Sequence, residues 1–185
     1  MTVSFVVTST LQTAISTHNA HLLQEHRKEK QQANKPCNCQ QKQLCPLNGQ
    51  CLTECIVYKA TVTQTKTNKQ ETYIGLTANT FKTRYYGHKC SFKLKHKRSE
   101  TTLSNHIWKL NESNADHKID WEIVKRSKPY TPGKNICSLC LEEKFYILSR
   151  QPTLNHRKEI FAHCKHKKQF LLTNAVTSLS QATAF

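Results

Sequence analysis

The fold of this chain is decided by residues 56–88, which read IVYKATVTQTKTNKQETYIGLTANTFKTRYYGH. Apolar and polar residues alternate over 56–62, and a period of two is typical of a half-buried strand. A polar turn follows, and then a second short strand over 71–76, so the two strands are predicted to form a hairpin. Thr77 or Asn79 can cap a helix that runs from about residue 80 into the nineties.

The rest of the chain adds one strand and three helices to this hairpin. Apolar residues recur at helical spacing over 103–110, and they alternate as in a strand over 119–123. Residues 135–149 predict a third helix, which a proline closes, and 158–172 predict a last, basic one. The order β-β-α-α-β-α-α predicts an α+β domain with a small mixed or antiparallel three-stranded sheet flanked by helices.

The composition divides the chain into four segments. Residues 1–36 form a polar tail or linker without a sustained apolar stripe and are predicted to be disordered. Residues 37–54 are a cysteine-rich segment with too few large apolar residues for a core of its own, so zinc is expected to stabilise it. The main domain spans 55–172, and 173–185 form a C-terminal tail.

Lys and Arg total 28 against 12 Asp and Glu, which gives a net charge of +16. This excess favours a polyanionic partner, and DNA is the partner we expect. No apolar run approaches the roughly 20 residues needed to span a bilayer, so no membrane partner is expected. Between Thr72 and Ser99 the chain has many basic residues and no acid; the alternative to a DNA-tracking surface is a solvated charged helix. The predicted phosphate contacts are Lys82, Lys89, Lys93, Lys95, Lys97 and Arg98.

Nine cysteines are an odd number and occur in tight pairs, which favours metal ligation over disulfides. The spacing predicts two structural zinc sites, with free buried thiols as the alternative at each. Cys37–Cys39 is a tighter gap than usual, so a histidine could replace Cys39. Cys55 and Cys90 are predicted to be small core residues. The first ligand set is Cys37, Cys39, Cys45 and Cys51. The second set is Cys137, Cys140, Cys164 and His166, with His163 as a rival.

A group of side chains suited to phosphodiester hydrolysis spans the hairpin and the helices. Tyr58 and Tyr73 can project from one face of the hairpin, and Arg84 and His88, four residues apart, share a helix face. Such a reaction needs an activated water, charge neutralisation at phosphorus and help for the leaving oxygen. At Gly75 the missing side chain is predicted to let a phosphate approach the backbone. The candidate catalytic residues are Tyr58, Tyr73, Arg84, His88, Glu143 and Asn155.

Glu143 is preferred to Glu142 as the ligand of a divalent cation. It lies between Leu139 and Ile147 at helical spacing, and an acid among apolar neighbours needs a compensating charge. A competing apolar stripe, formed by Leu141, Phe145 and Leu148, is the alternative core face of this helix.

Five stretches resemble, in order, the motifs of the GIY-YIG nuclease family. Tyr73-Ile74-Gly75 is similar to the second half-motif and Ile56-Val57-Tyr58 to the first, although Ile56 stands where the family has glycine. Thr80–His88 resembles the helix with the family's Arg and His. Residues 141–144 resemble the helix with the metal-binding Glu. Leu154-Asn155 resembles the stretch with the late Asn.

The resemblance is more specific to the endonuclease domain of Penelope-like retroelements. Val57-Tyr58-Lys59-Ala60, the Cys-x-Cys and Cys-Pro-Leu-x-Gly-x-Cys run upstream, and Cys137-x-x-Cys140 carry it. It implies DNA nicking with one Mg²⁺ or Mn²⁺, and we expect a nuclear location. A complete element would also carry a reverse transcriptase domain, which these 185 residues do not contain.

The same resemblance implies a role for each site residue. Glu143 holds the metal, and Tyr58 is the general base, unless the base is shared with His88. Arg84 stabilises the phosphoryl group, Tyr73 positions water or phosphate, and Asn155 supports the site. Two alternatives remain open: a catalytically inactive, zinc-containing DNA-binding module, and a zinc-finger interaction protein without nuclease activity.

Overall fold

The structure is a computed structural model that describes residues 11–31, 36–131, 134, 136–164 and 166. The chain divides into two units. The larger unit consists of Ala33–Tyr130 and Ile136–Cys164 and holds the sheet. The smaller unit includes helix α1, and each unit is described by itself.

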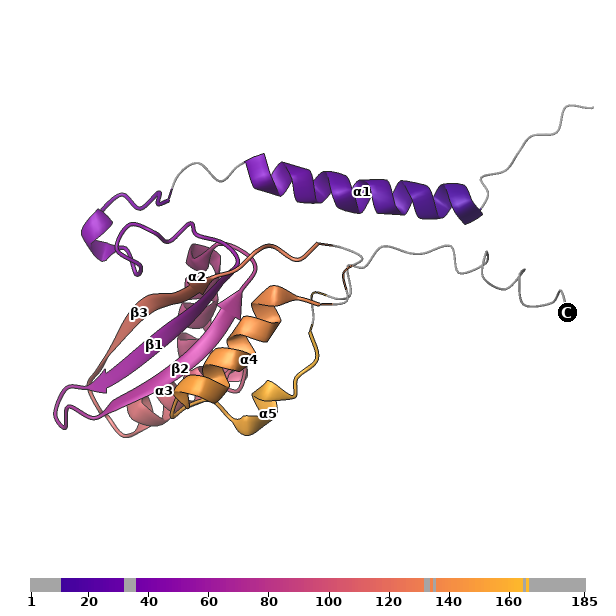
Figure 1. Ribbon diagram of the computed structural model, residues 1–185. Helices are drawn as coiled ribbons and strands as arrows, with labels where there is room; N and C mark the ends of the chain where they lie inside the picture. Colours follow the sequence, from indigo (N-terminus) through magenta and orange to yellow (C-terminus); the bar gives the residue numbers. More distant parts are fainter. Residues whose placement is uncertain (1–10, 32–35, 132–133, 135, 165, 167–185) are drawn as a thin grey trace, which may run out of the picture. The chain divides into compact units, whose positions relative to one another are not determined.

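The sheet has three antiparallel strands: β1 (Ile56–Gln64), β2 (Gln70–Thr77) and β3 (His117–Arg126). Their order is β2-β1-β3, so β1 lies in the centre and is buried over most of its length (Figure 1). In the register of the hairpin, Tyr58 lies opposite Gly75. The predicted α+β class and three-stranded sheet are confirmed, because the alternating residues of β1 supply both faces of the core.

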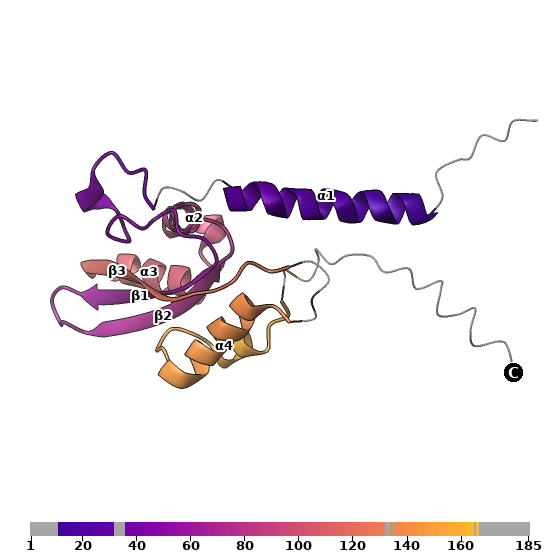
Figure 2. The same ribbon diagram turned by 45° about the horizontal axis from the view of Figure 1, so that its top comes forward.

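Helices cover both faces of this sheet (Figure 2). One face packs against α2 (Phe81–Lys93) and α3 (Thr102–Glu112), which bury Phe81, Leu103, Ile107 and Leu110 with the even-numbered residues of β1. The other face packs against α4 (Ser138–Arg150) through Leu139 and Ile147. Short helical turns lie at η1 (Lys42–Leu44), η2 (Lys95–Lys97) and α5 (Arg157–Ile160).

The helix starts differ in detail from the prediction. Thr80, not Thr77 or Asn79, caps α2, because its hydroxyl accepts the N–H of Thr83 at 3.3 Å. Thr77 is the last residue of β2, and its hydroxyl donates instead to the carbonyl of Asn79. The helix predicted from residue 135 begins at Ser138.

The predicted last helix over 158–172 is also different. The structure has a four-residue helix, α5, none of whose side chains is fully buried. Four residues without a buried face offer little packing to extend a helix. Residues 165 and 167–172 lie outside the described part of the chain, as does the predicted tail at 173–185.

A helix, α1 (Leu11–Gln31), occupies most of the segment predicted to be disordered. The second half of this helix is rich in the helix-forming residues Leu, Gln, Glu, Lys and Arg, although no apolar stripe runs along it. Over 11–24 its side chains are exposed or half-buried. Across the described residues, no helix combines the length and apolar character required to cross a bilayer.

Candidate active site and metal-binding clusters

Tyr58 is the centre of the candidate active site. Its side chain has no exposed surface, and its hydroxyl lies 2.7 Å from Nε2 of His88. Arg84 donates from Nε to the same hydroxyl oxygen at 2.9 Å. Because Arg84 and His88 are one turn apart on α2, the shared helix face predicted from their spacing meets the tyrosine of β1.

The protonation states make this group a directed chain of hydrogen bonds. Burial, and secondly the charge of Arg84, lowers the pKa of His88 to about 3, so the imidazole is neutral at neutral pH. Burial raises the pKa of Tyr58, against the opposing effect of Arg84. The phenol therefore keeps its proton and donates it to Nε2 of His88, while its oxygen accepts from Arg84.

Tyr73 lies beside this pair on β2. Its ring centroid is 6.5 Å from that of Tyr58 and 6.3 Å from that of His88. Burial raises its pKa well above the ordinary value, and the positive charge of Arg84 acts on it as well as on Tyr58. The two predicted tyrosines therefore share one guanidinium.

Gly75 makes room for Tyr58 rather than for a phosphate. It lies within β2, two residues before the strand ends, and a Cβ at this position would sit 2.7 Å from the hydroxyl oxygen of Tyr58 and 2.8 Å from Cε1 of Tyr73. The two rings occupy the space beside Gly75 where the sequence predicted a phosphate to approach the backbone.

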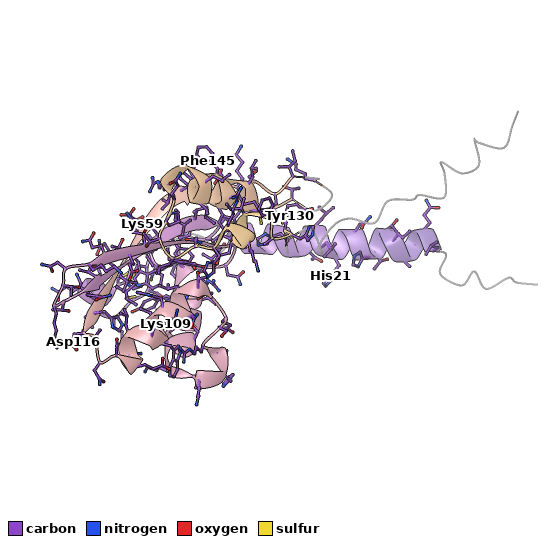
Figure 3. All side chains as sticks on the ribbon, turned by 90° about the horizontal axis from the view of Figure 1, so that it is seen from below. His21, Lys59, Lys109, Asp116, Tyr130 and Phe145 are labelled. Carbon is purple, nitrogen blue, oxygen red and sulfur yellow. The ribbon has the colours of Figure 1, made fainter. Side chains whose placement is uncertain are left out.

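Glu143 lies on the inward face of α4. Its neighbours one turn away, Leu139 and Ile147, are buried, which identifies this stripe as the one that faces the sheet. Phe145 points outward from the helix (Figure 3). The competing stripe is exposed by more than half at each of Leu141, Phe145 and Leu148.

The electrostatic state of Glu143 fits a divalent cation. Burial, and then the charge of Glu159, raises the pKa of Glu143 to about 7, although Arg84, Lys144 and a backbone hydrogen bond from Leu76 act in the opposite direction. A carboxylate whose charge is under-compensated gains from a cation, and carboxylate oxygens are the ligands that Mg²⁺ and Mn²⁺ prefer. The donor set is therefore compatible with the predicted metal.

Asn155 fastens the segment after α4 to the free edge of β2. Its Oδ1 accepts the N–H of Ile74 at 2.7 Å, and its Nδ2 donates to the carbonyl of Ile74 at 2.8 Å. Two residues earlier, Thr153 accepts the N–H of Thr72 at 2.8 Å. Asn155 thus holds the strand between Tyr73 and Gly75, which is a supporting position.

Sequence reasoning missed Glu159. Its Oε2 lies 2.5 Å from Nδ2 of Asn155, and its charge acts on Glu143 and on both tyrosines. The one signal in the sequence is its spacing of four residues from Asn155, which is inconspicuous in a basic stretch.

The first cysteine cluster could hold zinc. The sulfur atoms of its four members lie within 4.8 Å of one another, and Cys39 is among them, 3.6 Å from Cys51. Burial alone would raise the pKa of Cys45, but hydrogen bonds from the backbone of Leu47 and Gly49 lower it to about 7. Metal binding needs the thiolate form, which these backbone hydrogen bonds favour at Cys45. The set is Cys37, Cys39, Cys45 and Cys51, as predicted from the sequence.

This cluster is joined to the start of α2. The carbonyl of Cys51 accepts the N–H of Lys82 at 2.7 Å, and that of Thr53 accepts the N–H of Phe81 at 2.9 Å. Leu47, from the same segment, is buried in the core with Phe81. The first amides of α2 therefore find their partners in the cysteine-rich segment.

Three thiols of the second predicted set also gather. Cys137, Cys140 and Cys164 have their sulfur atoms within 4.8 Å of one another, with 3.3 Å between Cys140 and Cys164. This cysteine cluster could bind a metal such as zinc. His166 belongs to the other unit of the chain, so its part as fourth ligand stays a prediction; the rival, His163, is exposed.

The two remaining cysteines differ. Cys55 is buried, as predicted, and its thiol donates to the carbonyl of Ala78 at 3.4 Å. The prediction for Cys90 is wrong, because its position on α2 faces solvent, away from the side that carries His88.

The predicted DNA-binding residues are not equally available. Arg98 is held by both carboxylate oxygens of Glu112, with Nη2–Oε2 at 3.1 Å, and Lys82 donates to Asn38 at 2.7 Å. Lys89 lies over the ring of Tyr85, and Lys97 is 3.8 Å from Glu100. Lys93 and Lys95 are exposed at the end of α2 and in η2.

Comparisons of the chain with protein-family models, with curated proteins and with solved structures find no match. The resemblance to GIY-YIG nucleases therefore stays a prediction, which rests on the residues and their geometry.

Proposed function

We propose that the chain is a metal-dependent endonuclease of the GIY-YIG type that nicks DNA by phosphodiester hydrolysis. The observation that carries the proposal is the meeting of Tyr58, Arg84 and His88 in one buried hydrogen-bonded group. Tyr58 comes from a strand and the other two from a helix: Arg84 lies 26 positions and His88 lies 30 positions after the tyrosine. Each of them alone is a common structural residue; their convergence beside an under-compensated carboxylate is what favours catalysis.

In this proposal Glu143 holds one Mg²⁺ or Mn²⁺ through its carboxylate. When bound, such a cation neutralises charge on the phosphate and lowers the pKa of a coordinated water. Arg84 supplies the fixed positive charge, because its guanidinium can grip a phosphate oxygen with the N–H groups that the tyrosines leave free.

Tyr58 and His88 handle the proton. The phenol donates to Nε2 of the neutral His88, so a proton that reaches the tyrosine oxygen can be balanced by transfer of the phenol proton to the imidazole. Tyr58 is fully buried, so water reaches its oxygen only after neighbouring side chains move. Tyr73, on β2, and Asn155, which is hydrogen-bonded to β2, position these groups.

DNA is the proposed partner, and the net charge of +16 supports it. Both cysteine clusters are structural in this proposal. A retroelement origin, a nuclear location and a reverse transcriptase domain in the complete element follow from the resemblance to Penelope-like endonucleases.

The direct test is a nicking assay on supercoiled plasmid with purified, zinc-loaded protein. Conversion to open circles that requires added Mg²⁺ or Mn²⁺ is the expected result. DNA binding without any strand break, under every metal condition, would exclude the nuclease.

That second outcome corresponds to a catalytically inactive DNA-binding module. The observation that favours it is the complete burial of Tyr58, with its hydroxyl engaged by two partners. The nicking assay separates the two functions, because a module of this kind keeps salt-sensitive binding and forms no open circles.

A further inference from the structure

Glu159 connects three parts of the larger unit. It lies on α5, and its Oε2 is 2.5 Å from Nδ2 of Asn155. Its Oε1 accepts the hydroxyl of Thr102, at the start of α3, at 3.2 Å. The carboxylate of Glu159 therefore connects α3 with Asn155, the residue that is hydrogen-bonded to the edge of β2.

The bond to Asn155 fixes the orientation of that amide. Oδ1 of Asn155 receives the N–H of Ile74, and Nδ2 has two N–H groups, of which one donates to the carbonyl of Ile74. Glu159 accepts the other. All the amide's polar groups are thus used, and an ionised acceptor makes the last bond a strong one.

Glu143 and Glu159 together carry more negative charge than Arg84 offsets, and a bound cation would compensate for this excess. His88 and the two tyrosines are uncharged at neutral pH, which leaves the guanidinium of Arg84 as the buried positive charge facing Glu143 and Glu159. Lys144 also faces Glu143, but its ammonium donates to the carbonyl of Ala162 in an exposed bond, where water screens it.

We propose that Glu159 is a positioning residue of this site, which holds Asn155 by its amide and supplies the second negative charge felt by a cation bound at Glu143. The inference rests on the proposed nuclease for the choice of Mg²⁺ or Mn²⁺. Groups that surround a metal site without binding the metal typically change metal affinity or activity by 10- to 100-fold.

The test measures Mn²⁺ binding to the full, zinc-loaded chain by isothermal titration calorimetry, with nicking against Mg²⁺ concentration as the second readout. Glu159→Gln keeps the shape and an oxygen acceptor for Asn155 but removes the charge. Glu159→Asp keeps the charge on a shorter side chain. Asp120→Asn is the matched control, because it removes one charge from a surface pair with Lys118 on β3.

Glu159→Gln should weaken Mn²⁺ binding on the order of tenfold or more, with an unchanged circular dichroism spectrum, while Glu159→Asp retains most of the affinity. Equal affinities for Glu159→Gln and Asp120→Asn would overturn the proposal. So would an equal loss in both Glu159 variants, since that would assign the effect to shape rather than charge.

The calorimetry also separates this inference from the nuclease. Wild-type protein that binds Mn²⁺ but never nicks refutes the nuclease, and weaker binding by Glu159→Gln then still supports the role of Glu159. Wild-type protein that nicks, together with a Glu159→Gln variant of normal affinity, refutes the role of Glu159 alone. Wild-type protein without Mn²⁺ affinity refutes both.

Discussion

At the scale of single residues, a neutral histidine buried beside an arginine makes stability depend on pH. The folded pKa of His88 is about 3, below its ordinary value, so the unfolded chain binds a proton that the folded chain rejects. The stabilisation is fully present above the ordinary pKa and is lost as the pH falls toward the folded value. The effect of Glu143 has the opposite sign, because its raised pKa favours the folded state as the pH falls below about 7.

We predict that a fall from pH 7 to pH 5.5 lowers the free energy of unfolding by about 1 kcal/mol through His88 alone. The measurement is urea unfolding at both pH values for wild type and for His88→Gln, which cannot titrate. Since Glu143 and the thiols titrate in both proteins, the difference between the two curves isolates His88. His96→Gln, at an exposed histidine, is the control substitution. Parallel curves for wild type and His88→Gln would contradict the prediction.

The close approach at Gly75 gives a second prediction for a single residue. In Gly75→Ala the added methyl group would meet the hydroxyl of Tyr58 at 2.7 Å, so the ring must move from His88 and Arg84. We expect a loss of about 1–3 kcal/mol of stability, as for other overpacked cores, together with loss of nicking.

Gly87→Ala is the matched control for this change. Gly87 is exposed on the same helix as His88, and a Cβ there meets nothing within 4 Å. Alanine in a helix interior is favoured over glycine by about 1 kcal/mol, so this variant should be at least as stable as wild type. If Gly75→Ala were as stable and as active as Gly87→Ala, the ring of Tyr58 would not need the space beside Gly75, and the prediction would be contradicted.

At the scale of elements, α2 depends on the cysteine-rich segment for its first hydrogen bonds. We predict that removing metal from the first cluster loosens α2, because the carbonyls of Cys51 and Thr53 then lose their fixed positions. Hydrogen exchange should become faster at the amides of Phe81 and Lys82 in Cys51→Ser, and nicking should fall. Cys90→Ser, at the exposed cysteine on the same helix, should change neither.

Hydrogen exchange in α3 gives the internal comparison. Its first turn is capped by its own Thr101, whose hydroxyl accepts the N–H of Ser104 at 3.0 Å, so its protection should persist in Cys51→Ser. Equal loss of protection in α2 and α3 would mean general unfolding rather than a lost cap. Unchanged protection in α2 would mean that the segment does not support it.

Much of the element pattern could be predicted from the sequence, because burial on one side imposes a period. Leu103, Ile107 and Leu110 are all buried on α3, and the alternation over 119–123 lies within β3. The shared face of Arg84 and His88 followed from helix geometry in the same way. Their meeting with Tyr58 of β1 needed the family resemblance, since no local pattern joins residues so far apart.

Other features have no such period. The bonds of Thr153 and Asn155 to the edge of β2 join residues 81 positions apart, and they depend on where α4 ends. The role of Gly75 required the register that sets it opposite Tyr58. The sequence offered two competing apolar stripes for the inward side of α4, one with Leu139 and one with Leu141. The stripe with Leu139, which includes Glu143, packs against Val57 and Ile74 and is therefore the inward one.

At the scale of the whole molecule, the excess of basic residues should make DNA binding steeply dependent on salt. We predict that Lys93→Gln with Lys95→Gln flattens the slope of log K against log salt by up to about 2, since each phosphate contact contributes roughly 0.9. Arg98 should contribute less than the sequence suggested, because Glu112 already binds its guanidinium.

The control for the salt experiment is Lys118→Gln, which removes a lysine paired with Asp120 on β3. Fluorescence anisotropy with a labelled duplex over a range of salt concentrations gives both slopes. An unchanged slope in the double variant would show that the DNA follows another surface.

The central claim is that Glu143 binds the metal of a nuclease, and a pair of substitutions on α4 tests it most directly. Glu143→Gln removes the carboxylate on the inward stripe, while Glu142→Gln removes the neighbouring one and serves as the control. Plasmid nicking is measured against Mg²⁺ concentration for both variants, with circular dichroism and DNA affinity recorded on the same preparations. Glu143→Gln should abolish metal-dependent nicking with fold and DNA binding intact, and Glu142→Gln should keep most of the activity. Loss of nicking in Glu142→Gln but not in Glu143→Gln would contradict the assignment of the metal site.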